Sequence, residues 1–498
     1  MDMDGTAGDD VDRISALPDD LLHVILTHLR TALDVTRTAA LSRRWRRVWV
    51  HARDLSLVDL EFYEKGASPD DFAGFVDWVI AQRGDADMDS LQIAMELSID
   101  HPPPDKINEW IRYAAQRVAG DFDLRIPVRS DPCQTPIKLP GHGRASSISL
   151  HLPYHVLQFP PAAAARYEAL ASLTLLDVSF AGDEDGRAFC DFLSSSSCPR
   201  LRTLVMERPW ELTQLVLRVE ALQELRVLSM ALMAVDVTAP NLRIFDLVFN
   251  YRFTGVRIVA PRLQEIGIRT ISFSTTPNTR RDLDIHGLES VHCLLGEICL
   301  EIHAHHFSFE TETSVNFWLL KNCPGVEDIK LRLSHGPDEY AAADEFIDLT
   351  SEGAARFPNV RSMLLEADYI PERHLVASIS SLLLRFPRLR SLCIKITDTD
   401  RDVLRCFCHQ IGMCYDHGNS SLEFLKEVEV CLRRAVDEYA TVDKFVDLTS
   451  EGAARFPNIS PSIGSMTLYA NSEMPHGDDS PELMRHKLMD ICSTDWGQ

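Results

Sequence analysis

The pattern of apolar and polar positions first becomes helical between residues 17 and 29. Its large apolar residues recur at helical spacing and predict one apolar face: Leu21, Leu22, Ile25, Leu26 and Leu29. Pro18 suits a first helical turn, where its missing N–H has no partner to lose. Asp19 and Asp20 complement the positive end of the helix dipole. We therefore expect a helix that begins near Pro18.

Two further short helices are expected directly after it. Asp34 can cap a second helix that runs through Leu41, and Ser42 can cap a third. On the third helix Trp45, Val48 and Trp49 share one face, while arginines cover the rest of it: Arg43, Arg44, Arg46 and Arg47. Three helices in about forty residues bury little apolar surface by themselves. Part of this surface is expected to pack against another protein.

Most of the remaining sequence follows a degenerate repeat. The pattern apolar-x-x-apolar-x-apolar begins at eleven positions: Leu170, Leu201, Leu222, Leu242, Leu263, Leu288, Val326, Val360, Leu389, Leu425 and Ile463. Each copy predicts a short strand whose alternate residues point inward, followed by a helix or an irregular return. Because no such unit can bury its apolar face alone, neighbouring units must stack. An ordinary α/β domain with strands of similar composition is the alternative.

One block of the sequence is duplicated. Residues 348–359 recur letter for letter at 447–458, within similar blocks at about 331–360 and 430–459. A solenoid tolerates such a tandem copy because its units contact only their neighbours. Catalytic machinery is rarely copied this way, so the duplication favours a scaffold over an enzyme.

The charge is unevenly distributed along the chain. The formal net charge is −24, yet residues 13–53 contain eight arginines against three aspartates, so everything else carries −29. An acidic chain is not a general nucleic-acid binder, because phosphate backbones require a basic surface. A basic module on an acidic body indicates a dedicated acidic partner for that module.

No motif indicates catalysis, a cofactor or a metal. We find no nucleophile elbow, zinc-protease helix or kinase signature. The cluster Cys406, Cys408, His409 and Cys414 lacks paired Cys-x-x-Cys spacing and fits buried thiols better than zinc. The histidines of residues 303–306 have no matching carboxylate or cysteine motif nearby. We expect no catalytic residue, no cofactor and no metal.

The helical module resembles an F-box of the form found in plant leucine-rich-repeat F-box proteins. The resemblance rests on Arg13–Leu22, with its leucine–proline pair, and on the run Ala40–Trp49, with its leucine–serine–basic–basic–tryptophan phrase. It implies binding of the acidic Skp adaptor, which links the module to a cullin. By position, the adaptor-binding residues would be Leu17, Pro18, Leu21, Leu22, Ile25, Leu41, Arg43, Arg44, Trp45 and Trp49. Trp45 and Trp49 would pack the third helix, and the arginines would complement the acidic adaptor.

The repeats resemble leucine-rich repeats, and the stretch from Leu422 to Val430 resembles the start of an FBD-like region, here degenerate. The expected fold is α/β, a small helical F-box followed by an irregular leucine-rich-repeat solenoid. The expected divisions are a disordered acidic start (1–12), the F-box (13–53), the solenoid (54–470) and a tail (471–498).

The resemblance implies a non-catalytic substrate-recognition subunit of a Skp–cullin–F-box ubiquitin ligase, whose repeats bind an unknown protein target. A repeat scaffold acting outside any ligase is the first alternative, and a hydrolase or transferase the second. The first residues lack a secretory signal, and no run approaches about 18 apolar residues. We therefore expect a cytoplasmic and/or nuclear protein without membrane or nucleic-acid partners.

Overall fold

A computed structural model describes most of the chain up to residue 335 and shorter stretches beyond it. The described residues are 14, 17–29, 31–60, 69–95, 102–127, 133–249, 253–270, 282–303, 306–308, 313–335, 356–368, 382–383, 385–397, 427–433 and 465–471. The chain divides into two compact units, Met1–Arg262 with Arg280–His286, and Leu263–Thr279 with Gly287–Gln498. Each unit is described by itself.

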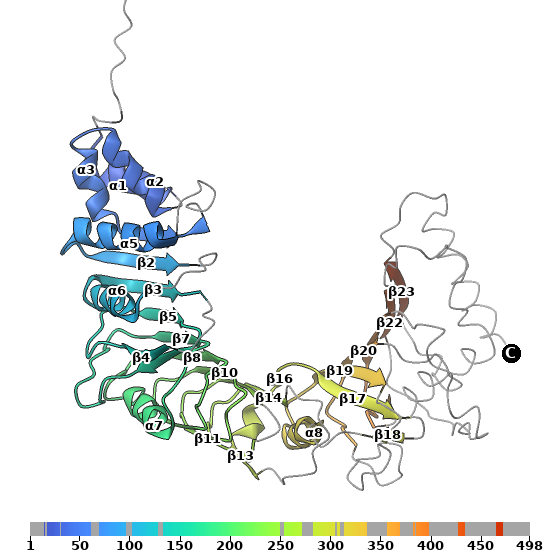
Figure 1. The fold of residues 1–498 in the computed structure, drawn as a ribbon. Helices are drawn as coiled ribbons and strands as arrows, with labels where there is room; N and C mark the ends of the chain where they lie inside the picture. Colours follow the sequence, from blue (N-terminus) through green and yellow to red (C-terminus); the bar gives the residue numbers. More distant parts are fainter. Residues whose placement is uncertain are drawn as a thin grey trace, which may run out of the picture. The chain divides into compact units, whose positions relative to one another are not determined.

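The first unit begins with the helical module (Figure 1). Its elements are α1 (Asp19–Thr27), α2 (Ala32–Arg37), the 3-10 turn η1 (Thr38–Ala40), α3 (Trp45–Val48) and the 3-10 turn η2 (Trp49–His51). Two expectations about helix ends need correction. Pro18 precedes α1 as its N-cap instead of lying in the first turn. Thr31, not Asp34, caps α2, because its Oγ1 accepts the Asp34 backbone N–H at 3.3 Å. Ser42 does serve the third helix, since its Oγ accepts the Trp45 N–H at 3.3 Å.

A parallel sheet follows in the first unit, and Figure 1 shows its strands side by side. In spatial order the strands are β1 (Asp54–Val58), β2 (Met88–Ala94), β3 (Val118–Arg125), β5 (Ser147–His151), β7 (Ser172–Leu176), β8 (Thr203–Glu207), β10 (Glu224–Leu228) and β12 (Ile244–Phe249). Because the register is in step from strand to strand, buried side chains align in rows. One row is Leu57, Ile93, Leu124, Leu150, Leu175, Met206, Val227 and Leu247. Each full burial of such a side chain stabilises by about 1.5–3 kcal/mol.

The segments that return from one strand to the next differ along this unit. The helices α5 (Pro69–Arg83), α6 (Pro104–Arg117) and α7 (Asp183–Phe192) return the chain after β1, β2 and β7. A two-stranded parallel pair, β4 (Cys133–Lys138) with β6 (His155–Gln158), flanks β5 in the sequence. Further along, the returns are strands and form a second parallel sheet: β9 (Gln214–Arg218), β11 (Ala234–Thr238), β13 (Gly255–Val259) and β15 (Asp282–His286).

The second unit contains a parallel strand pair and a seven-stranded sheet. β14 (Glu265–Thr270) pairs with β16 (Cys293–Leu294), and the 3-10 turn η3 (Leu288–Ser290) lies between them in the sequence. The larger sheet has the order β18-β17-β19-β20-β21-β22-β23, and only β18 is antiparallel to its neighbour. Its elements, with the helix α8, are β17 (Ile298–His303), β18 (His306–Ser308), α8 (Thr313–Asn322), β19 (Asp328–His335), β20 (Ser362–Asp368), β21 (Ser391–Thr397), β22 (Glu427–Arg433) and β23 (Ser465–Asn471).

The repeat pattern located strands well from residue 170 onward. Ten of the eleven predicted starts are followed two residues later by the first residue of a strand; the exception is Leu288, which lies in η3. The structure therefore confirms the α/β class, with helices followed by stacked parallel strands. The sequence pattern missed β1, β2, β3 and β5, as well as the second sheet built from the returns.

Several expectations concern residues outside the described part of the chain. These are the acidic start, the C-terminal tail, the cysteines near residue 406 and most of the duplicated block. The strands that precede the two copies are described, and β19 and β22 begin 99 residues apart, at Asp328 and Glu427. Among the described residues, no three histidine, cysteine, aspartate or glutamate side chains gather as metal ligands. No helix formed by these residues has the length and apolarity needed to cross a membrane.

Candidate protein-interaction surface

The helical module has its own filled core. From α1, Leu22 and Leu26 point inward and are 0% and 1% exposed. The other core side chains come from the following helices, all at most 4% exposed: Ala32, Val35, Trp45, Val48 and Trp49. The large apolar side chains of the module that remain exposed therefore lie outside this core.

A second apolar face of α1 remains exposed. Leu21, Val24 and Ile25 are 49%, 52% and 36% exposed, although each is a large apolar residue. Leu41, before α3, is 67% exposed, and Ile14, ahead of α1, is 54% exposed. Five of the twelve exposed large apolar side chains of the described chain therefore lie in this small module. Exposed apolar clusters of this kind mark interaction sites.

The predicted site residues fall into two groups. Pro18, Leu21, Ile25 and Leu41 are exposed and Leu17 is half-buried. Leu22, Trp45 and Trp49 are inside the core and hold the helices in place. The prediction had put Leu21 and Leu22 on one contact surface, but in the structure Leu21 is exposed and Leu22 is buried in the core.

Sequence reasoning missed Val24 and Ile14 as exposed apolar residues. A signal for Val24 was present, because it lies three residues after Leu21 and next to Ile25 and so shares their helical face. No comparable pattern surrounds Ile14.

The predicted arginines also separate by role. Arg44 binds within the module: its Nε donates to Asp19 Oδ1 at 2.9 Å, and its Nη2 donates to the Leu17 carbonyl oxygen at 2.5 Å. It thereby fastens the start of α1 to α3. Arg46 Nε donates to the Ala39 carbonyl oxygen at 3.2 Å, but Arg43, Arg46 and Arg47 are all exposed. Their positive charge is available to an acidic partner.

The helical module is packed against the first repeats through α5. The rings of Trp49 and Trp78 stack with centroids 5.6 Å apart. Arg83, at the end of α5, is 3% exposed, and its guanidinium donates to the Trp49 carbonyl oxygen at 3.5 Å and to that of Asp87 at 3.4 Å. Burial lowers the pKa of Arg83 from its usual value. One buried cation thus contacts both the module and the segment entering β2.

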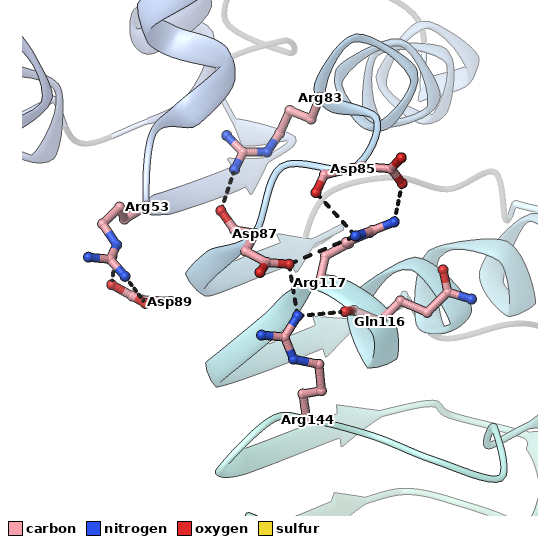
Figure 2. Close-up of polar contacts among 8 residues, drawn as sticks. All are labelled: Arg53, Arg83, Asp85, Asp87, Asp89, Gln116, Arg117 and Arg144. Carbon is pink, nitrogen blue, oxygen red and sulfur yellow. Dashed lines mark hydrogen bonds and ion pairs between the residues drawn. The ribbon is translucent and has the colours of Figure 1, made fainter. Parts of the chain in front are cut away.

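A network of ion pairs lies next to this contact between the helical module and the first repeats (Figure 2). Three aspartates alternate along the segment that enters β2, and each binds an arginine. Arg117 pairs with Asp85, Arg144 Nη1 lies 2.8 Å from Asp87 Oδ1, and Arg53 Nε lies 2.8 Å from Asp89 Oδ2. The hydrogen bond from Arg144 lowers the pKa of Asp87. Exposed ion pairs stabilise little individually. Of these three, the pair of Arg53 with Asp89 links the end of the helical module to β2.

Comparisons with known proteins point to one class. The family model described as At1g61320/AtMIF1, LRR domain, matches residues 80–264. The Arabidopsis thaliana F-box/FBD/LRR-repeat protein At4g03220 is 24% identical over 468 residues, which are 89% of this chain and 85% of that protein. F-box/LRR-repeat protein 13 of the same organism is 27% identical over 45% of this chain and 47% of its own length. The FBD-associated F-box protein At5g22730, also from Arabidopsis thaliana, is 27% identical over 52% of this chain and 51% of its own length.

These findings confirm the resemblance to F-box proteins of the leucine-rich-repeat class. The two shorter matches cover about half of those relatives. The match to At4g03220 extends over most of both chains.

Proposed function

We propose that this F-box and leucine-rich-repeat protein is a substrate-recognition subunit of a Skp–cullin–F-box ubiquitin ligase. The observation that carries the proposal is the exposed apolar face of α1 on a module whose core is already filled. Leu21, Val24 and Ile25 are 49%, 52% and 36% exposed, and a partner that covers them would gain the free energy of burying that exposed part.

The chemistry of the module fits an acidic adaptor. Residues 13–53 carry a net charge of +5 on a chain of −24. Arg43 and Arg47 are exposed on the segment that also carries Leu41. Complementary charge accelerates association and selects the partner, while the apolar face supplies the affinity. We therefore place the adaptor contact on Leu17, Pro18, Leu21, Ile25 and Leu41.

The contribution to ubiquitin transfer would be proximity. The repeats would hold a protein target while the adaptor and cullin bring the charged conjugating enzyme, which raises the effective concentration of the target lysine. This role needs no nucleophile, metal or cofactor in this chain, so we propose a non-catalytic subunit. It also places the protein in the cytoplasm and/or nucleus, where such ligases would meet their targets.

The test is binding of the purified full chain to a purified Skp-type adaptor. The test variant is the double substitution Leu17→Ala/Pro18→Ala. The matched control is Leu60→Ala, which shortens a 46% exposed leucine outside the module. We expect tight binding by wild type and by the control, and loss of binding by the double variant.

The contrary result is equally informative. If well-folded wild type does not bind the adaptor, the ligase assignment is wrong and the chain is a repeat scaffold acting elsewhere. If the double variant binds like wild type, the adaptor contact does not include the start of α1.

A further inference from the structure

A second exposed apolar surface lies on the repeats of the first unit, far along the sequence from the helical module. Four of its side chains follow the strands of the parallel sheet: Tyr154 after β5, Trp210 after β8, and Met230 and Met233 after β10. They are 42%, 40%, 42% and 42% exposed. The strands β5, β7, β8 and β10 are parallel neighbours, so the loops that follow them meet at one edge of the sheet. We call these four residues the Tyr154–Trp210 surface.

The two aromatic rings form a pair across the β7 loop. Their centroids are 6.3 Å apart and their planes differ by 23°. The backbone of Trp210 is fixed on both sides, because its N–H donates to the Val178 carbonyl oxygen at 2.9 Å and its own oxygen accepts from the Phe180 N–H at 3.0 Å. The backbone that carries the exposed Trp210 ring is therefore held in place.

The loops after β5, β7 and β8 contain all the described non-glycine residues whose backbone is in the left-handed region. Tyr154, Asp177, Arg208 and Glu211 have φ of 59°, 55°, 48° and 62°, and they are the described non-glycine residues with positive φ. Each such residue costs of order 1 kcal/mol and persists only where its surroundings hold it. Strain of this kind gathers at ligand-binding sites more than elsewhere.

Polar contacts beneath the rings hold the strained loops. Arg208 donates from Nε to Asp177 Oδ1 and from Nη2 to Asp177 Oδ2, both at 2.6 Å. His151 Nε2 lies 3.0 Å from Asp177 Oδ2. Partial burial raises the pKa of Asp177, but the bonds from Arg208 and His151 outweigh it and leave that pKa below its usual value. The loops are thus fixed before any partner arrives, which reduces the entropic cost of binding.

The charge around the rings is negative. Residues 177–187, which include the start of α7, and residues 207–213 contain six acidic residues and two basic ones, Arg187 and Arg208. Arg208 is already bound to Asp177. Glu211 is exposed directly beside Trp210, and Asp183 and Glu184 are exposed in the first turn of α7. A partner that fits this surface must bring positive charge.

We propose that the Tyr154–Trp210 surface binds a basic segment of a protein partner that presents an apolar side chain among lysines or arginines. The apolar side chain packs on Met230 and Met233, whose flexible thioethers adapt to different shapes. A lysine or arginine lies over the exposed aromatic faces, where a cation is attracted by the ring electrons, and pairs with Glu211. Only the further statement that this partner is the ubiquitination target rests on the proposed ligase function.

The test uses three short synthetic peptides with a fluorescent label, titrated against the full chain by anisotropy. The first peptide alternates lysine or arginine with leucine and methionine. In the second every basic residue is replaced by glutamate, and in the third every apolar residue is replaced by serine. We expect only the first to bind measurably, with an affinity that falls as salt is raised, because exposed charges are screened.

The variants locate the site. Trp210→Ala should weaken binding of the first peptide about tenfold or more, as expected for an aromatic anchor. Glu211→Gln should weaken it less and should reduce the salt dependence. Leu60→Ala, the control used above, should bind like wild type. Equal binding of the glutamate peptide, or unchanged affinity in Trp210→Ala, overturns the proposal.

Adaptor binding of the same variants separates the two proposals. Trp210→Ala should bind the Skp-type adaptor like wild type, since Trp210 lies outside the helical module. If wild type binds the basic peptide but no adaptor, the surface stands and the ligase assignment fails. If it binds the adaptor but the basic peptide binds no better than its two counterparts, the surface is refuted and the ligase assignment stands.

Discussion

Substitutions of the two neighbouring leucines of α1, Leu21 and Leu22, should distinguish an effect on adaptor binding from an effect on the stability of the module. Leu21 is 49% exposed and Leu22 is 0% exposed, although one peptide bond separates them. Leu21→Ala should therefore change what a partner can bury, and Leu22→Ala should change what the module itself buries.

The magnitudes follow from these exposed fractions. Full burial of a leucine side chain stabilises by about 1.5–3 kcal/mol, so the half that Leu21 leaves exposed can contribute about 1 kcal/mol to binding. Its loss should weaken adaptor binding about fivefold. Leu22→Ala removes a fully buried side chain and should cost about 2–5 kcal/mol of stability. A helix of nine residues depends on such tertiary packing to stay formed.

Two measurements on the full chain test this pair. Amide hydrogen exchange over residues 19–27 reports local opening of α1, and calorimetric titration with a Skp-type adaptor reports affinity. Leu21→Ala should keep wild-type protection and lose affinity, while Leu22→Ala should lose protection first and affinity with it. The reasoning is refuted if Leu22→Ala retains full protection yet binds as weakly as Leu21→Ala, because the buried side of α1 would then be the contact surface.

Three further predictions concern the repeats and the contact between the helical module and α5. Arg83→Met should leave overall secondary structure intact but raise amide hydrogen exchange in η2, because the Arg83 guanidinium no longer donates to the Trp49 carbonyl oxygen. Unchanged exchange would show that the stack of Trp49 on Trp78 alone holds the helical module against α5. Gly120→Ala should lower stability by about 1–3 kcal/mol in urea unfolding, because the added Cβ would overlap the Asp89 carbonyl oxygen; a neutral effect would contradict that close approach. The lowered pKa of Asp177 means that its carboxylate stabilises the fold above its ordinary pKa of 3.8 and loses this effect as the pH falls through the folded value. Asp177→Asn should therefore be less stable than wild type at neutral pH and should converge with it in acid, and a constant difference across that range would refute the ionic role.

Local patterns in the sequence were sufficient to locate most of the repeat strands. A leucine, valine or isoleucine two residues before a strand and alternating apolar residues within the strand are short-range signals, so most strand starts from Ser172 onward could be located. The caps at Ser42 and the arginine-rich third helix were readable for the same reason. The early strands were missed because the same pattern starts there with a residue other than leucine, valine or isoleucine, as at Ala52, which precedes Leu55 and Leu57 of β1.

Other features depended on residues that are far apart in the sequence. Helical spacing predicted a single apolar face on α1, but only the packing of Trp45 and Trp49 decides that Leu22 faces the core and Leu21 faces outward. The stack of Tyr154 on Trp210 joins residues from two repeats, and no local pattern records it.

The sequence by itself therefore determined the class of the protein, the order of its parts and the position of most repeat strands. The tertiary structure alone decided which apolar side chains are available to partners. The physical reason is that propensity and periodicity act over a few residues, whereas exposure depends on what distant segments cover. Both proposed binding surfaces consist of side chains that local signals mark as apolar and that the fold leaves uncovered.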